Sequence, residues 1–357
     1  MTSKKITLIL ALLVLAIFAV GSVSATDNIT ADSDVSVDDV VVDEVPTDDV
    51  VESEKIVEPT RASHIVNNSM SNSAINQEIV AAYNDNTNHV VDFTTGTYYG
   101  ASFTVQNNVV LDGHGSTLIG DGTNDIFLVT QKSNFTIKNF IIDLNGSRHG
   151  IYGHHVYNSI ITNNTISNGE DGINIYQVHE NLTITDNTID NMSGDGISLV
   201  NFNTYTDAEF NSFIASTVSG NTITNSRYGM FFGGNFKGVI NNNTIRNAVY
   251  AMEFAGKKSA SNGKLNVEIC NNIVTNVTTG INMRHPHVKV LNIHNNTFNT
   301  TVPGSNYVIN VDGNFSKDPY GIILVINNVL NGIVNQTFKN NTNLAYGNSG
   351  SGAYTKP

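Results

Sequence analysis

A pair of adjacent polar residues, usually two asparagines, returns along most of the 357-residue chain and is followed by Thr-Ile or a similar dipeptide. Two copies show the pattern clearly: residues 158–166 are NSIITNNTI and residues 180–189 are ENLTITDNTI. The second member of the pair stands at Asn164, Asn187, Asn221, Asn243, Asn272, Asn296 and Asn328, with Asn108 and Phe140 assigned to the same slot of two earlier copies. A repeat of about 22–24 residues with insertions is typical of a solenoid.

Within each copy, apolar residues alternate with polar ones, which is the period of a β-strand. Three short strands and their turns use up about 22 residues, so the repeat predicts an all-β fold: a parallel β-helix of about nine coils stacked about 4.8 Å apart. Asparagine tolerates the left-handed backbone of a tight turn, and stacked amides can hydrogen-bond along the axis. We therefore expect the paired slot to form a structural asparagine ladder in which the ladder residues themselves are left-handed.

The solenoid is expected to span residues 62–346, with its N-terminal end closed by a helix. Residues 73–83 have helical spacing and begin with serine, which is a good N-cap. Such a helix would cover the open core and the unpaired strand edges of the first coil. Residues 347–357 are expected to be a flexible tail.

The first 61 residues have the features of an export signal followed by a linker, and not those of a folded domain. Two lysines precede the apolar run Ile6–Val20, and small residues end at Ala25, so residues 1–25 have the features of a signal peptide. Residues 26–61 hold 12 acidic side chains against one lysine, which predicts a disordered acidic linker. We expect an extracellular or cell-surface protein that is monomeric and has no stable membrane span after cleavage.

Composition excludes several classes of function. The chain has a single cysteine, Cys270, which argues against a disulfide framework and against a cysteine-based zinc or iron–sulfur site. Only 18 lysines and arginines stand against 31 acidic residues, so no basic face is available for nucleic acid. Two-histidine metal sites at His155 with His179, or at His285 with His287, remain an alternative.

This organisation resembles the right-handed parallel β-helix superfamily, the pectin-lyase-like fold. The Asn-rich coils behind an acidic spacer are similar to the adhesin-like surface proteins of methanogenic archaea. The resemblance implies the fold, and it leaves open lyases, hydrolases, epimerases and non-catalytic adhesins, because all of these use that fold.

Chemistry is expected on an outward strip beside recurring Gly-Ile strands such as Gly172–Ile175 and Gly196–Leu199. The candidate catalytic residues are Asp171, Asp195, Arg148, Arg227 and His149. The candidate ligand-binding residues are Tyr152, His154, Glu170, Asn174, Tyr176, Ser198, Tyr228 and Glu253. Asp171 and Asp195 would lie on adjacent coils, where close carboxylates share Ca²⁺, raise one another's pKa, or serve only as turn residues.

Two functions follow from this strip. The first is an adhesin that binds a polysaccharide or cell-surface glycan without turnover and without a cofactor, except that Ca²⁺ is possible. The alternative is a polysaccharide lyase or C-5 epimerase that acts on uronic-acid polymers through the outward face of the middle coils. We favour binding, because no complete set of catalytic residues emerges from the alignment of the coils.

Overall fold

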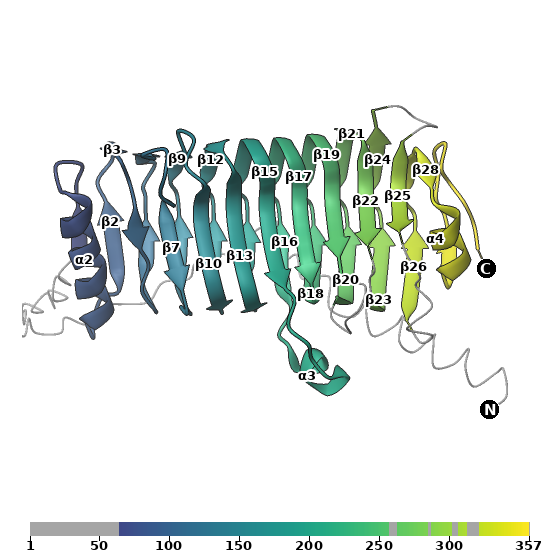
Figure 1. The fold of residues 1–357 in the computed structure, drawn as a ribbon, viewed down its shortest axis with the longest axis horizontal. Helices are drawn as coiled ribbons and strands as arrows, with labels where there is room; N and C mark the ends of the chain where they lie inside the picture. Colours follow the sequence, from purple (N-terminus) through teal and green to yellow (C-terminus); the bar gives the residue numbers. More distant parts are fainter. Residues whose placement is uncertain (1–63, 257–262, 285–286, 302–305, 313–320, 357) are drawn as a thin grey trace, which may run out of the picture. The chain divides into compact units, whose positions relative to one another are not determined.

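The computed structural model describes residues 64–256, 263–284, 287–301, 306–312 and 321–356. The expected signal peptide and acidic linker lie outside these residues. The described chain forms two parallel sheets and three helices that follow one another as stacked coils (Figure 1). Among the described residues, no helix has the length and apolar character needed to cross a membrane.

The first sheet has 12 parallel strands, one from each coil. In spatial order they are β1 (His64–Val66), β2 (Val90–Phe93), β5 (Val110–Asp112), β8 (Thr136–Lys138), β11 (Ile160–Thr162), β14 (Thr183–Thr185), β16 (Ser216–Ser219), β18 (Phe236–Asn241), β20 (Lys264–Cys270), β23 (His287–His294), β26 (Ile322–Ile326) and β29 (Leu344–Tyr346). The sheet has more strands than the nine coils expected, because the first coils lack the asparagine that marks the repeat and the last coil lies partly in the expected tail.

The second sheet has 17 strands and takes two segments from most coils. In chain order they are β3 (Thr97–Tyr99), β4 (Phe103–Thr104), β6 (Thr117–Ile119), β7 (Phe127–Thr130), β9 (Ile141–Asp143), β10 (His149–Tyr157), β12 (Thr165–Gly169), β13 (Asp171–Glu180), β15 (Thr188–Asn201), β17 (Thr222–Gly234), β19 (Thr244–Ala255), β21 (Ile273–Val277), β22 (Thr279–Arg284), β24 (Thr297–Thr300), β25 (Tyr307–Asp312), β27 (Val329–Asn331) and β28 (Ile333–Val334). Inward side chains of both sheets form one continuous apolar core.

Helices lie at both ends of this stack and on one insertion (Figure 1). Helix α2 (Asn72–Asn84) starts after the N-cap Ser71, two residues before the serine predicted as the cap, and packs Ile75, Ile79 and Ala82 against the first coils. Helix α3 (Asp207–Ser212) lies in the insertion between β15 and β16, and α4 (Gln336–Asn341) buries Phe338 near the C-terminal end. The apolar face of α2 therefore joins the core cluster next to β1, β2 and β4.

The buried asparagine ladder is confirmed from Asn164 to Asn328. Each Oδ1 accepts hydrogen bonds from the backbone N–H and the Nδ2 of the asparagine on the preceding coil, at 2.9–3.0 Å. Phe140 occupies the slot before Asn164, whose Oδ1 accepts from the Phe140 backbone at 3.1 Å. The ladder therefore runs without a break through the middle coils and ends against an aromatic side chain.

The assignment of Asn108 to this column is wrong. Asn108 is exposed, and its Oδ1 accepts a hydrogen bond from Asn134 in a different column. The slot before Phe140 belongs to Ser116, whose carbonyl accepts from Ile141 just as the Phe140 carbonyl accepts from the next coil. The first coils have no asparagine in this slot, so the nearest Asn pair in the sequence misled the alignment.

The left-handed residues are also not the ladder residues. Positive φ angles of 54–68° occur instead at the residue just before each of these positions, namely Asn139, Asn163, Asp186, Gly220, Asn242, Asn271, Asn295 and Asn327. The two neighbouring residues thus have different roles. The first adopts the left-handed backbone of the turn and lies outside the core, and the second points its amide inward, where the amide is hydrogen-bonded.

The C-terminal residues differ from the expected tail. Asn348 continues the ladder, since its Oδ1 accepts from the backbone N–H of Asn328 at 3.0 Å and from its Nδ2 at 3.1 Å. Lys356 then pairs with Ala345 in an antiparallel bridge. The chain after residue 346 therefore completes the last coil and folds back across it.

Candidate functional site

The predicted outward strip lies on the 17-stranded sheet, where β10, β13, β15, β17, β19 and β22 are neighbours. The register pairs Tyr152 with Asn174, Asn174 with Ser198, and Ser198 with Phe231. It then continues through Glu253 to Asn282. These are the residues two positions after each glycine slot, so the coil alignment from sequence places the strip correctly.

A row of acidic groups and one imidazole crosses the start of these strands. His149 is only 3% exposed, and its Nδ1 lies 2.7 Å from Asp125 Oδ1. Its Nε2 lies 3.5 Å from an oxygen of Asp171, with which it is in register. His149 is therefore held between two carboxylates, and both of its ring nitrogens already face a partner.

Asp171 is occupied by structural hydrogen bonds. One oxygen accepts from the backbone N–H of Asp195 at 2.7 Å, and the other accepts from Asn174 Nδ2 at 2.7 Å. The residue is 7% exposed. A free general base or a Ca²⁺ ligand needs lone pairs that face open space, and the Asp171 carboxylate has most of its own committed to the fold.

Asp195 is the carboxyl group of this row with the most unusual environment. Burial and, second, the negative charge of Asp171 raise its pKa to about 7, although Ser198 and Arg227 favour the ionised form. Such a group changes its charge near neutral pH and can act as either proton donor or acceptor. Asp171 is therefore held by hydrogen bonds, whereas the pKa of Asp195 lies near neutral pH.

An open groove of about 620 Å³ lies beside Asp195. Its lining residues are Gly146, Asn168, Gly169, Glu170, Asn191, Met192, Ser193, Gly194 and Arg227. Exposed Arg148 and Glu170 face each other across neighbouring coils at 3.5 Å, and the Arg227 guanidinium lies 5.1 Å from the centroid of the Tyr228 ring. The groove thus offers amides and the Arg227 guanidinium, which donate to hydroxyl or carboxylate oxygens, and the Glu170 carboxylate, which accepts from hydroxyl groups.

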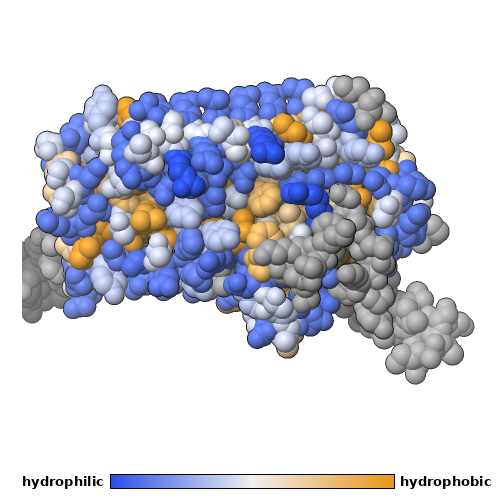
Figure 2. All heavy atoms as spheres, in the orientation of Figure 1, coloured by the Kyte–Doolittle hydropathy of each residue, from blue (hydrophilic) through white to orange (hydrophobic). Residues whose placement is uncertain are grey.

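Aromatic rings accompany the polar groups along the strip. Tyr152 stacks on His149 with ring centroids 4.7 Å apart, and its hydroxyl lies 2.7 Å from His154 Nε2. The His154 ring in turn lies 5.3 Å from the exposed ring of Tyr176. Two coils further on, Tyr228 and Tyr250 stack at 5.1 Å. Hydrophilic residues predominate over the face of the coils seen in Figure 2, and the apolar ones are scattered among them.

Two of the predicted ligand-binding residues are corrected by their burial. Ser198 is 2% exposed and Glu253 is 1% exposed, so neither presents a surface to a ligand. The Glu253 carboxylate instead accepts a hydrogen bond from Asn282 at 2.6 Å and pairs with Arg284. Conversely, Asn168, Asn191 and Ser193 line the groove and were missed, because they lie at the corner before the Gly-Ile strand rather than on it.

Two clusters of the described residues have enough ligating side chains for a metal ion. They are Asp92 with Asp112 and His114, and Glu268 with Cys270 and His294. In the first, Lys138 Nζ lies 2.8 Å from Asp112 Oδ2, so an ammonium group already neutralises this carboxylate. Stacking of the coils places Glu268 and His294 beside Cys270, so the single cysteine of the sequence does not by itself exclude a metal site with mixed ligands.

Comparisons with known proteins agree with this architecture. A model of the NosD family, described as periplasmic copper-binding protein, matches residues 31–219, just over half of the chain. No curated protein sequence matches.

Solved structures share the fold at low identity. An exopolygalacturonase from Thermotoga maritima is 11% identical, with 74% of this chain and 80% of that chain covered and a TM-score of 0.53. The surface adhesin PfbA of Streptococcus pneumoniae is 14% identical, with 74% and 77% covered and a TM-score of 0.49. An alginate lyase from a Paenibacillus species is 14% identical, with 70% and 99% covered and a TM-score of 0.44. The fold is the pectin-lyase-like right-handed parallel β-helix.

Proposed function

Because the chain belongs to the NosD family, described as periplasmic copper-binding proteins, we propose that it is exported, and that its outward strip binds a polysaccharide or cell-surface glycan without turnover. The observation that carries the glycan proposal is the groove of about 620 Å³ next to a run of tyrosine and histidine rings. Aromatic faces pack against sugar rings, while the amides and the Arg227 guanidinium of the groove bond to their hydroxyls and carboxylates.

The hydrogen bonds of Asp171 favour binding over catalysis. Hydrolysis of a glycosidic bond usually needs two carboxyl groups that both face the substrate. Asp171 is buried and accepts hydrogen bonds from the Asp195 backbone N–H and from Asn174. Of the predicted pair, this leaves Asp195, whose pKa is raised to about 7, as the carboxyl group suited to proton transfer. Ca²⁺ at this pair would have to displace those same hydrogen bonds, so the proposal includes no metal on the strip.

A lyase or C-5 epimerase is the second candidate, and the pKa of Asp195 favours it. A carboxyl group with a pKa of about 7 beside Arg227 is suited to proton transfer, which is the step that both reactions share. The two candidates predict the same groove and differ in whether the bound chain is changed.

The test is binding of the full-length protein to polygalacturonate, alginate and a neutral glucan, by isothermal titration calorimetry with and without Ca²⁺. We expect binding of an acidic polymer to weaken about tenfold in Arg227→Ala with Tyr176→Ala, because a charge-assisted contact and a stacking face are removed. Lys237→Ala, on β18 in the other sheet, removes the same charge and should bind like the wild type.

The outcomes separate the candidates. Binding with no change in the polymer supports the glycan-binding proposal. Unsaturated or epimerised product that disappears in Asp195→Asn supports the enzyme. Absence of binding to every polymer tested, or binding unaffected by the Arg227 and Tyr176 changes, overturns the assignment of the groove.

A further inference from the structure

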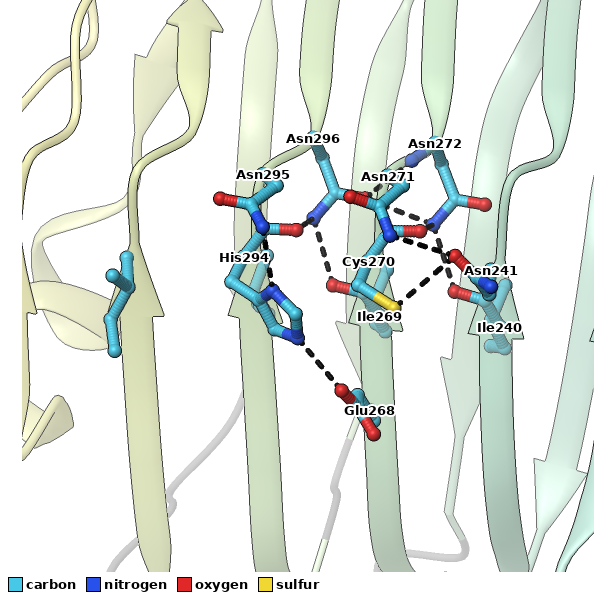
Figure 3. A network of polar contacts seen from close by, with 12 residues as sticks. Ile240, Asn241, Glu268, Ile269, Cys270, Asn271, Asn272, His294, Asn295 and Asn296 are labelled. Carbon is cyan, nitrogen blue, oxygen red and sulfur yellow. Dashed lines mark hydrogen bonds and ion pairs between the residues drawn. The ribbon is translucent and has the colours of Figure 1, made fainter. Parts of the chain in front are cut away.

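Three side chains with metal-ligating atoms converge on the outer face of the 12-stranded sheet, away from the groove. Glu268 and Cys270 alternate with buried Ile269 at the end of β20, so both point to the same side of the strand. His294 ends β23 on the next coil and is in direct register with Cys270. Figure 3 shows the imidazole and the carboxylate directed toward one another, with the thiol beside them.

The distances suit a single ion. The ligand atoms of the three residues all lie within 4.8 Å of one another, and His294 Nε2 is 2.8 Å from Glu268 Oε1. Around a tetrahedral ion with bonds of about 2.0–2.3 Å, such atoms lie about 3.3–3.5 Å apart. The three atoms are therefore close enough for rotation of the side chains to bring them to one ion as three of its ligands.

The type of ligand selects the type of metal. A thiolate and an imidazole favour ions of borderline or soft character, whereas Ca²⁺ and Mg²⁺ require oxygen ligands. We propose that Glu268, Cys270 and His294 form a mononuclear site for a d¹⁰ ion, Cu⁺ or Zn²⁺. When the ion binds, the Cys270 thiol releases its proton to solvent and the sulfur bonds to the metal as thiolate.

Neighbouring amides can hold the ligands in place. The side chain of Asn295 lies 3.2 Å from His294 Nδ1, and Cys270 Sγ donates to Asn241 Oδ1 at 3.4 Å. With metal on Nε2, the Nδ1–H donates to the Asn295 amide oxygen once that amide is flipped, which fixes the tautomer that the metal needs. Asn241 stays engaged by Asn271 Nδ2 at 3.0 Å after the thiol proton leaves.

The match to the NosD family ends at residue 219, so these donors come from the structure and not from that match. The repeat contains the signal for them: Asn241, Cys270 and His294 each stand two residues before a ladder asparagine, and stacking aligns equal offsets.

The experiment titrates the full-length reduced protein with Cu⁺ and, separately, Zn²⁺, against a chromophoric chelator, and counts bound metal by mass spectrometry of the native protein. We expect one ion per chain. Cys270→Ser and His294→Gln should each weaken binding about 100-fold, and Glu268→Gln about 10-fold. His114→Gln, in the other cluster, should bind like the wild type.

Co²⁺ supplies a readout that depends on the sulfur. The wild type should show a thiolate-to-cobalt charge-transfer band that is absent in Cys270→Ser and present in His114→Gln. Should Cys270→Ser fail to fold, the half-buried His294→Gln variant carries the test. Wild-type protein that binds neither Cu⁺ nor Zn²⁺, or whose binding is unchanged in His294→Gln, overturns the site. The groove and its glycan test do not depend on this result.

Discussion

The side-chain oxygen of Asn187 accepts two hydrogen bonds from Asn164 on the preceding coil, one from the backbone N–H and one from Nδ2, both at 3.0 Å. Asn187 also donates through Nδ2 to the carbonyl oxygen of Ile161 at 3.0 Å and to Asn221 Oδ1 at 3.0 Å. The residue is 1% exposed. Since a buried polar group without a partner is costly, the ladder stabilises the coils only where it is complete.

Asn187→Ala should lower the free energy of unfolding by about 2–4 kcal/mol, because it removes the acceptor of the buried Asn164 backbone N–H and the donor to the Ile161 carbonyl, while Asn164 Nδ2 keeps the carbonyls of Ile137 and Thr162. Chemical denaturation followed by circular dichroism measures the change. The matched control is Asn163→Gly at an exposed, left-handed position with φ of 54°. Glycine adopts this backbone conformation without strain, so the loss of unfolding free energy should stay within about 0.5 kcal/mol. Equal losses in the two variants would contradict the structural role of the ladder.

Gly196→Ala should also destabilise the stack. An added Cβ would lie 2.5 Å from Ile223 Cγ2 and 2.6 Å from the Gly229 carbonyl oxygen, so two adjacent coils would have to separate. Overpacking of this kind costs about 1–3 kcal/mol. Gly96→Ala is the control, because its added Cβ meets the flexible end of exposed Asn68 at 3.0 Å. A melting temperature that falls no further in Gly196→Ala than in Gly96→Ala would refute this prediction.

Asp195→Asn should change how stability depends on pH. The pKa of Asp195 is raised to about 7 from an ordinary 3.8, so the folded state holds this proton more tightly than the unfolded state. Its contribution is complete below about pH 4 and is lost as the pH rises toward 7. Relative to Asp195→Asn, the melting temperature of the wild type should therefore fall between pH 4 and pH 7.

Another buried group titrates in that range with the opposite sign. Burial lowers the pKa of His179 to about 4 from 6.5, so its contribution is lost as the pH falls through this interval. His179 is present in both proteins and cancels in the difference between them. Parallel melting curves for wild type and Asp195→Asn would show that Asp195 has an ordinary pKa.

Lys264→Met should loosen the insertion that carries α3. Lys264 is 6% exposed, and its ammonium lies 2.8 Å from Asp207 Oδ1 and donates to the carbonyl of Tyr205. Asp207 forms ion pairs with Lys264 and Lys289. Without the Lys264 charge, it keeps the pair with Lys289, whose Nζ lies 3.0 Å from Asp207 Oδ2. Limited proteolysis with mass spectrometry should show faster cleavage within residues 203–214 and no change elsewhere. Unchanged cleavage in the variant would assign the position of α3 to its apolar contacts.

The repeat made most of the fold predictable. The alternation of apolar residues fixes which side chains point inward, and the slot of Asn164 and Asn187 fixes the register between coils, so Ile173 pairs with Ile197 as expected. Phe140 was placed correctly, but where the slot holds Ser116 the same procedure assigned Asn108, which lies in another column. Register is therefore predictable only as far as a side chain that requires one particular slot is present.

The chemistry of the strip was less predictable, because it depends on what each side chain does with its neighbours. Spacing placed Asp171 and Glu253 on the outer face, but it does not reveal that Asp171 accepts the Asp195 backbone N–H or that Arg284 and Asn282 engage Glu253. Rotamers and hydrogen-bond partners set burial and pKa, and a periodic pattern contains no information on either.

Between coils, each amide of the column bonds to the coil before it and the coil after it, so a duplicated coil placed between Asn187 and Asn221 would find the same partners on both sides. The molecule can thus grow or shrink by whole turns, about 4.8 Å at a time, with both terminal caps retained. Its length is set by copy number, and relatives that differ in the number of turns should differ in reach while keeping the same cross-section.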